Sequence, residues 1–155
     1  MVNRDSAQGW ELHLADAASF AKFVKSLTPA KQRTLEASID KILLVHGFEV
    51  VDGDLVKNLG GGLYEFRVGP NTTRMMNKAG LESKIPHQKI VIRVFVSFEA
   101  DRIVVLLGSY DKGASDSKSK QQSEIAKARH LLKAWKSSGN YELNVIKLSA
   151  ERRPT

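Results

Sequence analysis

The residues best suited to chemistry lie on two strand-like runs in the middle of the chain. In the run LYEFRV, side chains alternate between the two faces of a strand, so Glu65 and Arg67 share one face. In the run IVIRVFVSF, the same alternation places Arg93 on the face opposite the apolar set. These groups predict a polar site on one side of a sheet, joined by Lys112 after the next strand. The simpler interpretation is an ion pair that stabilises an exposed strand face.

Two helices are expected before these strands. After a short candidate strand in WELHL, Asp16 is a typical N-cap residue for a helix whose apolar stripe begins at Phe20. Thr28, followed by a proline, starts a second helix, which Gly47 ends. The turn between them is short, so the two helices form a hairpin whose apolar side requires a sheet.

The strands that follow supply that sheet. The runs 90–98 and 103–110 flank the turn EADR and predict a β-hairpin. A third helix has its apolar stripe at Ile125, Ala128, Leu132 and Trp135, and 141–148 is a candidate last strand. We expect one α+β domain: an N-terminal helical hairpin packed on a small, mainly antiparallel twisted sheet, with a C-terminal helix. If the helices cover the apolar face, the face that carries Arg93 is open.

Composition limits the classes of protein to consider. The chain has 155 residues, of which 42% are hydrophobic and 26% charged, as in a globular protein. It has no cysteine, no secretion signal at its start and no apolar run long enough to span a membrane, so we expect a cytoplasmic protein. The four histidines lack ligand spacing, and we expect neither a metal nor a cofactor.

The net charge of +7 is unevenly distributed. Residues 1–60 hold 7 Lys and Arg against 8 Asp and Glu, whereas residues 61–155 hold 17 against 9. A basic surface attracts polyanions and gives sequence-independent affinity for phosphate backbones. This half of the chain therefore predicts binding either to a nucleic acid or to an acidic protein partner, although a merely solvated basic face is an equal alternative.

The order of these elements resembles the RelE/ParE superfamily of toxins from bacterial type II toxin–antitoxin systems, in its phage-derived, HigB-like branch. The resemblance covers about residues 10–136, leaving 137–155 as a C-terminal extension. It rests on an ordered set of short matches: Leu63–Arg67, Arg93, Asp101–Leu107, Lys112, Glu124, Ile125 and Ala128.

The resemblance implies a ribosome-dependent endoribonuclease that cuts messenger RNA without a metal and is held inactive by an antitoxin, with a helix-turn-helix fold expected for the latter. Cleavage by the ribose 2′-hydroxyl requires a proton acceptor, a stabiliser for the phosphate and a proton donor to the leaving oxygen. Arg67, Arg93 and Lys112 are the expected stabilisers. Glu65, Tyr110, Asp111 and His87 remain alternatives for the acid and the base.

Two features depart from the family pattern. Residues 69–89 form a long basic segment in place of a short turn, and we expect a loop that binds RNA, or the antitoxin, or neither. Its candidate RNA-binding residues are Arg74, Lys78, Lys84, His87 and Lys89. In addition, Lys112 stands beside Asp111, where relatives often carry paired lysines.

Two other functions stay open at this stage. The first is a ParE-like inhibitor of DNA gyrase, which shares the architecture and cuts nothing. The second is a non-catalytic basic binding module on the same scaffold. The lack of a clear acid–base residue would favour the gyrase inhibitor.

Overall fold

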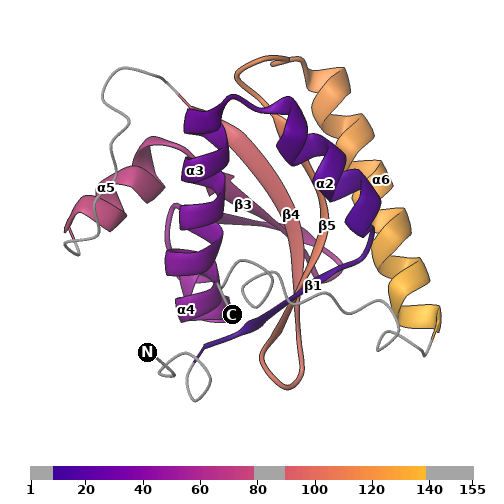
Figure 1. Ribbon diagram of the computed structural model, residues 1–155. Coiled ribbons are helices and arrows are strands. Elements are labelled where there is room, and N and C mark those ends of the chain that lie inside the picture. The colour runs from indigo at the N-terminus through magenta and orange to yellow at the C-terminus, as the bar shows by residue number, and fades with distance from the viewer. Residues whose placement is uncertain (1–8, 79–89, 139–155) are drawn as a thin grey trace.

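The computed structural model describes residues 9–78 and 90–138 of the chain (Figure 1). The strands and the short helices alternate along the sequence, and one long helix ends the described part. In chain order the elements are β1 (Glu11–Leu14), α2 (Ala17–Ser26), α3 (Pro29–Ser38), the π-helical turn η1 (Ile39–Leu43), α4 (Leu44–His46), the 3₁₀ helix η2 (Gly47–Asp52), β2 (Val56–Gly60), β3 (Leu63–Val68), α5 (Pro70–Lys78), β4 (Ile92–Glu99), β5 (Ile103–Asp111) and α6 (Lys118–Ser138).

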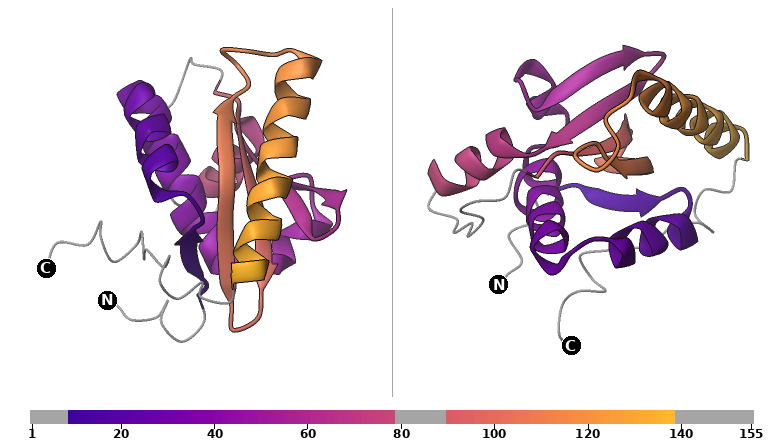
Figure 2. Two further views of the ribbon diagram at one scale, coloured as in Figure 1. Left: turned by 90° about the vertical axis from the view of Figure 1, so that its right-hand side faces the viewer. Right: turned by 90° about the horizontal axis from the view of Figure 1, so that it is seen from above.

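The five strands form one mixed sheet in the order β1-β5-β4-β3-β2. Only β1 and β5 run parallel, and the other three pairs are antiparallel. The helices α2 and α3 cover one face of this sheet, and α6 lies on the other (Figure 2). The expected α+β class is confirmed, with an N-terminal helical hairpin packed on a mainly antiparallel sheet and a C-terminal helix.

Each face of the sheet has its own apolar core, whereas the sequence predicted a core on one face only. Phe66 and Val94 belong to the core under α2 and α3, whereas Leu63 and Phe95 belong to the core under α6. All four side chains are fully buried. The face that carries Arg93 is therefore not open, because α6 covers part of it.

The helical hairpin is held by the caps that the sequence predicts. The side chain of Asp16 accepts a hydrogen bond from the Ser19 N–H (3.1 Å), and Thr28 Oγ1 accepts one from the Lys31 N–H (3.3 Å). Such caps satisfy N–H groups that have no partner within the helix. Gly47 has φ +56° and ends the second helix, as expected from a glycine at that position.

Two elements were missed by the sequence prediction. The strand β2 lies at the edge of the sheet and buries only Val56, so its polar residues hide the alternation. The expected loop 69–89 begins with the helix α5, which buries Thr72 and Met76. Thr72 Oγ1 caps that helix by accepting from the Gly69 N–H (3.0 Å). The candidate strand 141–148 lies outside the described residues.

Among the described residues, no helix combines the length and the apolar character that crossing a membrane requires.

Candidate functional site

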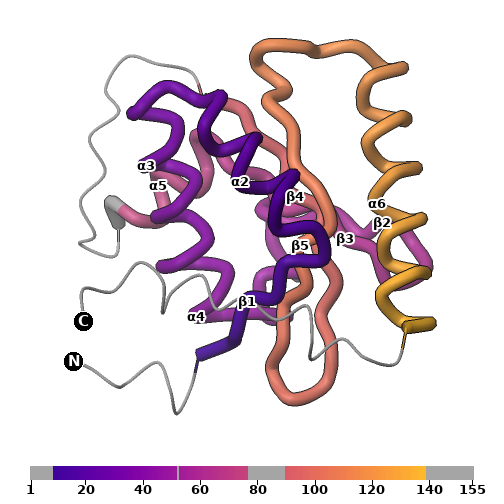
Figure 3. Tube along the Cα trace, turned by 45° about the vertical axis from the view of Figure 1, so that its right-hand side comes forward, coloured from indigo at the N-terminus to yellow at the C-terminus, as the bar shows by residue number. Residues whose placement is uncertain are grey.

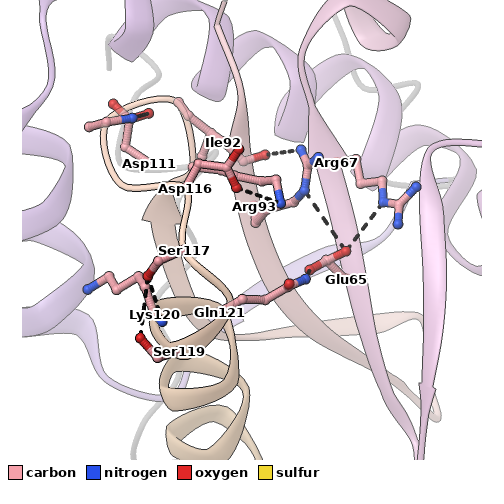
Figure 4. Close-up of polar contacts among 12 residues, drawn as sticks. Glu65, Arg67, Ile92, Arg93, Asp111, Asp116, Ser117, Ser119, Lys120 and Gln121 are labelled. Atoms are coloured by element: carbon pink, nitrogen blue, oxygen red, sulfur yellow. Dashed lines mark hydrogen bonds and ion pairs between the residues drawn. The ribbon is translucent and has the colours of Figure 1, made fainter.

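The site is built on one row of side chains across three strands. Arg67 of β3 pairs in register with Arg93 of β4, and Arg93 pairs with Tyr110 of β5. Residues paired in this way project from the same face of an antiparallel sheet, with Cβ atoms about 5 Å apart. Glu65 lies two residues before Arg67 on the same face. The register therefore brings four of the five expected catalytic residues together. Figure 4 shows three of them, Glu65, Arg67 and Arg93.

An irregularity in β5 decides which of its residues reach this face. Val96 pairs with Leu106, but the next residue, Phe95, pairs with Gly108, so Leu107 is an extra residue in the β5 ladder. Beyond this bulge the alternation is reversed, and Tyr110 faces α6 and Arg93.

The bulge turns Asp111 away from the site. Its Oδ2 accepts a hydrogen bond from Lys31 Nζ of α3 at 2.6 Å, on the opposite face of the sheet. Asp111, one of the alternatives for the acid or the base, therefore lies on the face away from Arg93, because strict alternation fails at Leu107.

Glu65 is the centre of the polar contacts and is fully buried. Its Oε1 accepts a hydrogen bond from Arg67 Nε (3.3 Å) and forms an ion pair with Arg93 Nε (3.9 Å). Its Oε2 accepts from Gln121 Nε2 of α6 (3.3 Å). One carboxylate thus orients two guanidinium groups, while α6 closes it off from solvent.

Burial shifts the pKa values of two groups around this carboxylate. Desolvation lowers the pKa of Arg93, an effect that the nearby Glu65 charge opposes and Arg67 reinforces. Desolvation likewise raises the pKa of Tyr110, and the negative charge of Glu65 raises it further. Tyr110 is therefore protonated at neutral pH.

The hydroxyl of Tyr110 has no hydrogen-bond partner among the described residues, although it is buried. Its ring stacks on Phe95, with the ring centres 6.0 Å apart and the planes 14° from parallel. An unpartnered buried hydroxyl costs free energy, so a native fold that keeps one invites a functional explanation.

Lys112 lies at the rim of the site. Its Nζ forms an ion pair with Asp116 Oδ1 at 3.2 Å, and the charge of Asp116 in turn acts on both Arg93 and Tyr110. The side chain of Asp116 points toward Arg93 in Figure 4. Lys112 is thus connected with Arg93 through Asp116.

Of the expected RNA-binding residues, Arg74 is the one whose side chain the structure describes, and it lies away from this site. Arg74 lies on α5, which packs against β3, α3 and η1 on the side away from α6 (Figure 1). Its Nη1 donates to Asn71 Oδ1 within the same helix (2.8 Å). Lys78 ends α5, and its side chain lies outside the described part of the structure, as do Lys84, His87 and Lys89.

Two residues that sequence reasoning missed belong to the site or its border: Gln121 and Asp116. Gln121 had a detectable signal, since it extends the apolar stripe of α6 by one step, four residues before Ile125. A polar residue in line with an apolar stripe predicts a buried polar contact. Asp116 lies on a polar segment and had no such signal.

No group of three or more His, Cys, Asp or Glu side chains that could hold a metal ion exists in the part of the chain that the structure describes. The sequence matches no protein-family model, and comparisons with curated proteins and with solved structures find no match.

Proposed function

We propose that this chain is the toxin of a type II toxin–antitoxin system, a metal-independent endoribonuclease that cuts messenger RNA on the ribosome. One observation supports this more than any other: Arg67 and Arg93 lie side by side on a sheet face and are oriented by the single buried carboxylate of Glu65. A pair of ordered guanidinium groups suits the negative oxygens of a phosphodiester.

In the proposed reaction the arginines stabilise the charge that develops on the phosphate. Arg67 is the accessible member, with 40% of its side chain exposed, and Arg93 lies deeper. Hydrogen-bond donors already held in position, in a site with little water, stabilise a developing charge more strongly than the same donors in bulk solvent. Glu65 acts as a positioning residue. Tyr110, protonated at neutral pH, donates a proton to the leaving 5′-oxygen, and a water molecule takes the proton of the attacking 2′-hydroxyl.

The charge of the chain supports the same proposal. The net charge of +7, concentrated in residues 61–155, suits a ribosomal surface made largely of RNA phosphate. A toxin of this kind acts in the cytoplasm and requires a cognate antitoxin, for which we propose a helix-turn-helix protein. The resemblance of the ordered motifs to the RelE/ParE superfamily supports this partner.

A second function, inhibition of DNA gyrase without cleavage, is favoured by one specific observation. Glu65 is 0% exposed and Tyr110 only 4% exposed, so both acid–base groups lie beneath α6. A binding protein can use the arginines and the basic surface without a solvent-accessible base, whereas a nuclease needs its proton-transfer groups within reach of the substrate.

Two assays on the purified chain separate these functions. In the first, a reporter mRNA is translated in a bacterial lysate with and without the chain, and new 5′ ends are mapped by primer extension. The nuclease predicts ends inside the reading frame that disappear when initiation is blocked. The second assay measures DNA supercoiling by purified gyrase in the presence of the chain. Inhibited supercoiling together with intact mRNA would favour the gyrase inhibitor. No effect in either assay would contradict both proposed functions.

A further inference from the structure

Three consecutive glycines connect β2 with β3, and α6 lies beside them (Figure 3). Gly60, Gly61 and Gly62 have φ of +90°, +66° and +85°, a backbone that residues with a side chain rarely adopt. The N–H groups of Gly61 and Gly62 donate to no residue within 9–78 or 90–138. Because no side chain covers these donors, an anion can approach them closely.

Arg129 of α6 is fixed at this glycine turn by two backbone carbonyls. Its Nη2 donates to the Leu59 carbonyl at 2.7 Å, and its Nη1 donates to the Gly60 carbonyl at 2.9 Å. A guanidinium group has five N–H donors, and these contacts use two of them. The carbonyls are neutral, so they leave the positive charge of this exposed side chain uncompensated. The fold therefore holds a charged donor in position at the turn.

A second cation lies at the same turn. A Cβ at Gly61 would lie 3.2 Å from Arg129 Nη1, and one at Gly62 would lie 3.7 Å from Lys136 Nζ. Both cations thus lie where the glycines lack a side chain. Within the described ranges, Lys136 forms neither an ion pair nor a hydrogen bond. The turn and α6 together bring two cations and two backbone donors to one place.

The cations of α6 are arranged at a cost to the helix. Arg129, Lys133 and Lys136 follow one another at intervals of four and three residues, so they share one side of α6. Like charges at these intervals destabilise a helix. The helix dipole offsets this for Lys136 in the last turn, but the effect falls off before Arg129. A bound anion would compensate the whole stripe.

The carboxylates of these elements do not neutralise the stripe. Glu65 is the one acid in the sequences of β2 and β3, and it is fully buried among its own partners. Glu124 is the one acid of α6, and its Oε2 pairs with Lys120 and Lys127. It lies on the side of α6 nearer α2, where it lines a cavity with Phe20. The side of α6 that faces the glycine turn is therefore positive.

The positive charge continues along β2 toward the arginine site. Lys57 pairs in register with Glu65, so its side chain lies on the α6 face of the sheet. It is exposed and has no ion-pair partner in the described part of the chain. A strand rises about 3.4 Å per residue, so the five residues from Gly62 to Arg67 span about 17 Å. A row of cations of this length suits the repeated charges of a nucleic-acid backbone better than one isolated anion.

We propose that the glycine turn and α6 form a second anion site, which binds a phosphate group of a nucleic-acid strand through Arg129, Lys136 and the turn N–H groups. Lys57 binds a further phosphate of the same strand on its way to Arg67. The choice of RNA as that strand rests on the function proposed above. Binding at the turn requires no cleavage, so the two proposals can fail separately.

The test measures binding without cleavage. A fluorescein-labelled oligouridine with 2′-O-methyl groups cannot be cut by its own 2′-oxygen, and fluorescence anisotropy gives its Kd at several salt concentrations. For a single strand, each phosphate contact contributes about −0.7 to the slope of log K against log salt. Joint Arg129→Gln and Lys136→Gln substitution should therefore reduce the slope by about 1.4 and weaken binding about tenfold or more at low salt.

Two further variants control for charge and for folding. Joint Lys22→Gln and Lys25→Gln substitution removes two exposed charges from α2, on the other face of the sheet, and should leave the slope unchanged. Lys136→Gln alone removes no hydrogen bond of the fold and should reduce the slope by about 0.7. Circular dichroism verifies that all variants are folded.

The possible results separate this site from the nuclease. Equal slopes for the α6 double variant and the α2 control, or no RNA binding by the wild type at low salt, would overturn the site. Equal affinity for polyglutamate would overturn phosphate as its ligand and favour an acidic protein. The expected slopes with uncut mRNA in the translating lysate would support the site and contradict the nuclease alone. Cleavage by the wild type with equal slopes would do the reverse.

Discussion

Arg93 and Tyr110 lie directly opposite each other on β4 and β5 because Leu107 is an extra residue in the β5 ladder. Without that bulge, Ser109 would lie opposite Arg93, Tyr110 would face the helical hairpin, and Asp111 would share the face of the arginine. A bulge of one residue therefore decides that Arg93 lies opposite the phenol of Tyr110 and that Asp111 leaves this face. The polar chemistry of the site depends on this local feature.

Loss of the buried carboxylate should destabilise the fold. Glu65→Ala leaves Arg93 largely buried without its ion-pair partner, and breaking a buried pair in this way costs roughly 3–5 kcal/mol in the free energy of unfolding. The control is Glu99→Ala at the end of β4, expected to cost less than about 1 kcal/mol. Urea unfolding measures both. Equal losses would show that Glu65 does not organise the site.

Removal of the Tyr110 hydroxyl should separate stability from activity. Because that buried hydroxyl has no partner among the described residues, Tyr110→Phe should leave stability unchanged or raise it by up to about 1–3 kcal/mol. Under the proposed function, loss of the proton donor slows cleavage by about 10²-fold or more. Tyr64→Phe, which changes a tyrosine on the other face of the sheet, is the control and should cleave normally.

The same tyrosine predicts a pH dependence of stability. The folded state raises the pKa of Tyr110 above its ordinary value of 10.0, so the stability linked to its proton is complete below pH 10. That contribution is lost as the pH rises through the folded-state pKa. Thermal unfolding between pH 9 and 11 should show a steeper loss for the wild type than for Tyr110→Phe. Parallel curves would contradict the raised pKa.

Asp111 should matter for stability and not for function. Asp111→Asn weakens its charge-assisted contact with Lys31, for which a loss of about 1–3 kcal/mol is expected. Lys31→Met should cause a similar loss, and the double variant should lose less than the sum of the two. Cleavage by the folded fraction should stay at the wild-type rate. A specific fall in cleavage would return Asp111 to the list of site residues.

The glycine that ends the second helix should not tolerate a side chain. A Cβ at Gly47 would lie 2.0 Å from Trp10 Cε2, and the residue has φ +56°. Overpacking and left-handed strain each cost about 1–3 kcal/mol, so Gly47→Ala should be strongly destabilising. Gly53→Ala is the control, because its nearest heavy atom is 3.9 Å away and its φ is negative. Thermal unfolding compares the two variants.

Periodicity predicted the elements whose sequence has one mainly apolar face. The alternation in β3 and β4 and the stripe of α6 are visible directly in the sequence, although β3 and β4 are buried on both faces of the sheet. The edge strand β2 buries one residue of five and therefore shows no period. The helix α5 was missed because its buried face consists of a threonine and a methionine within a polar, basic run.

The sequence predicted which residues form the site better than it predicted how deeply they are buried. Alternation placed Glu65, Arg67 and Arg93 on one face, which the register confirms. It could not indicate that α6 covers this face, because the packing of a distant helix is a tertiary property. Nor could it exclude Asp111, since a β-bulge leaves no mark on a run of apolar residues such as IVVLL.

The most direct test of the central claim is the rate of mRNA cleavage in a translating lysate by three forms of the chain: wild type, Arg93→Ala and Arg33→Ala. Arg33 is an exposed arginine on α3, across the sheet from Arg93, and so controls for the loss of one positive charge. If Arg93 stabilises the reacting phosphate, its loss should slow cleavage by about 10²–10³-fold, whereas Arg33→Ala cleaves at the wild-type rate. Equal rates for the folded Arg93→Ala and Arg33→Ala forms would contradict the account.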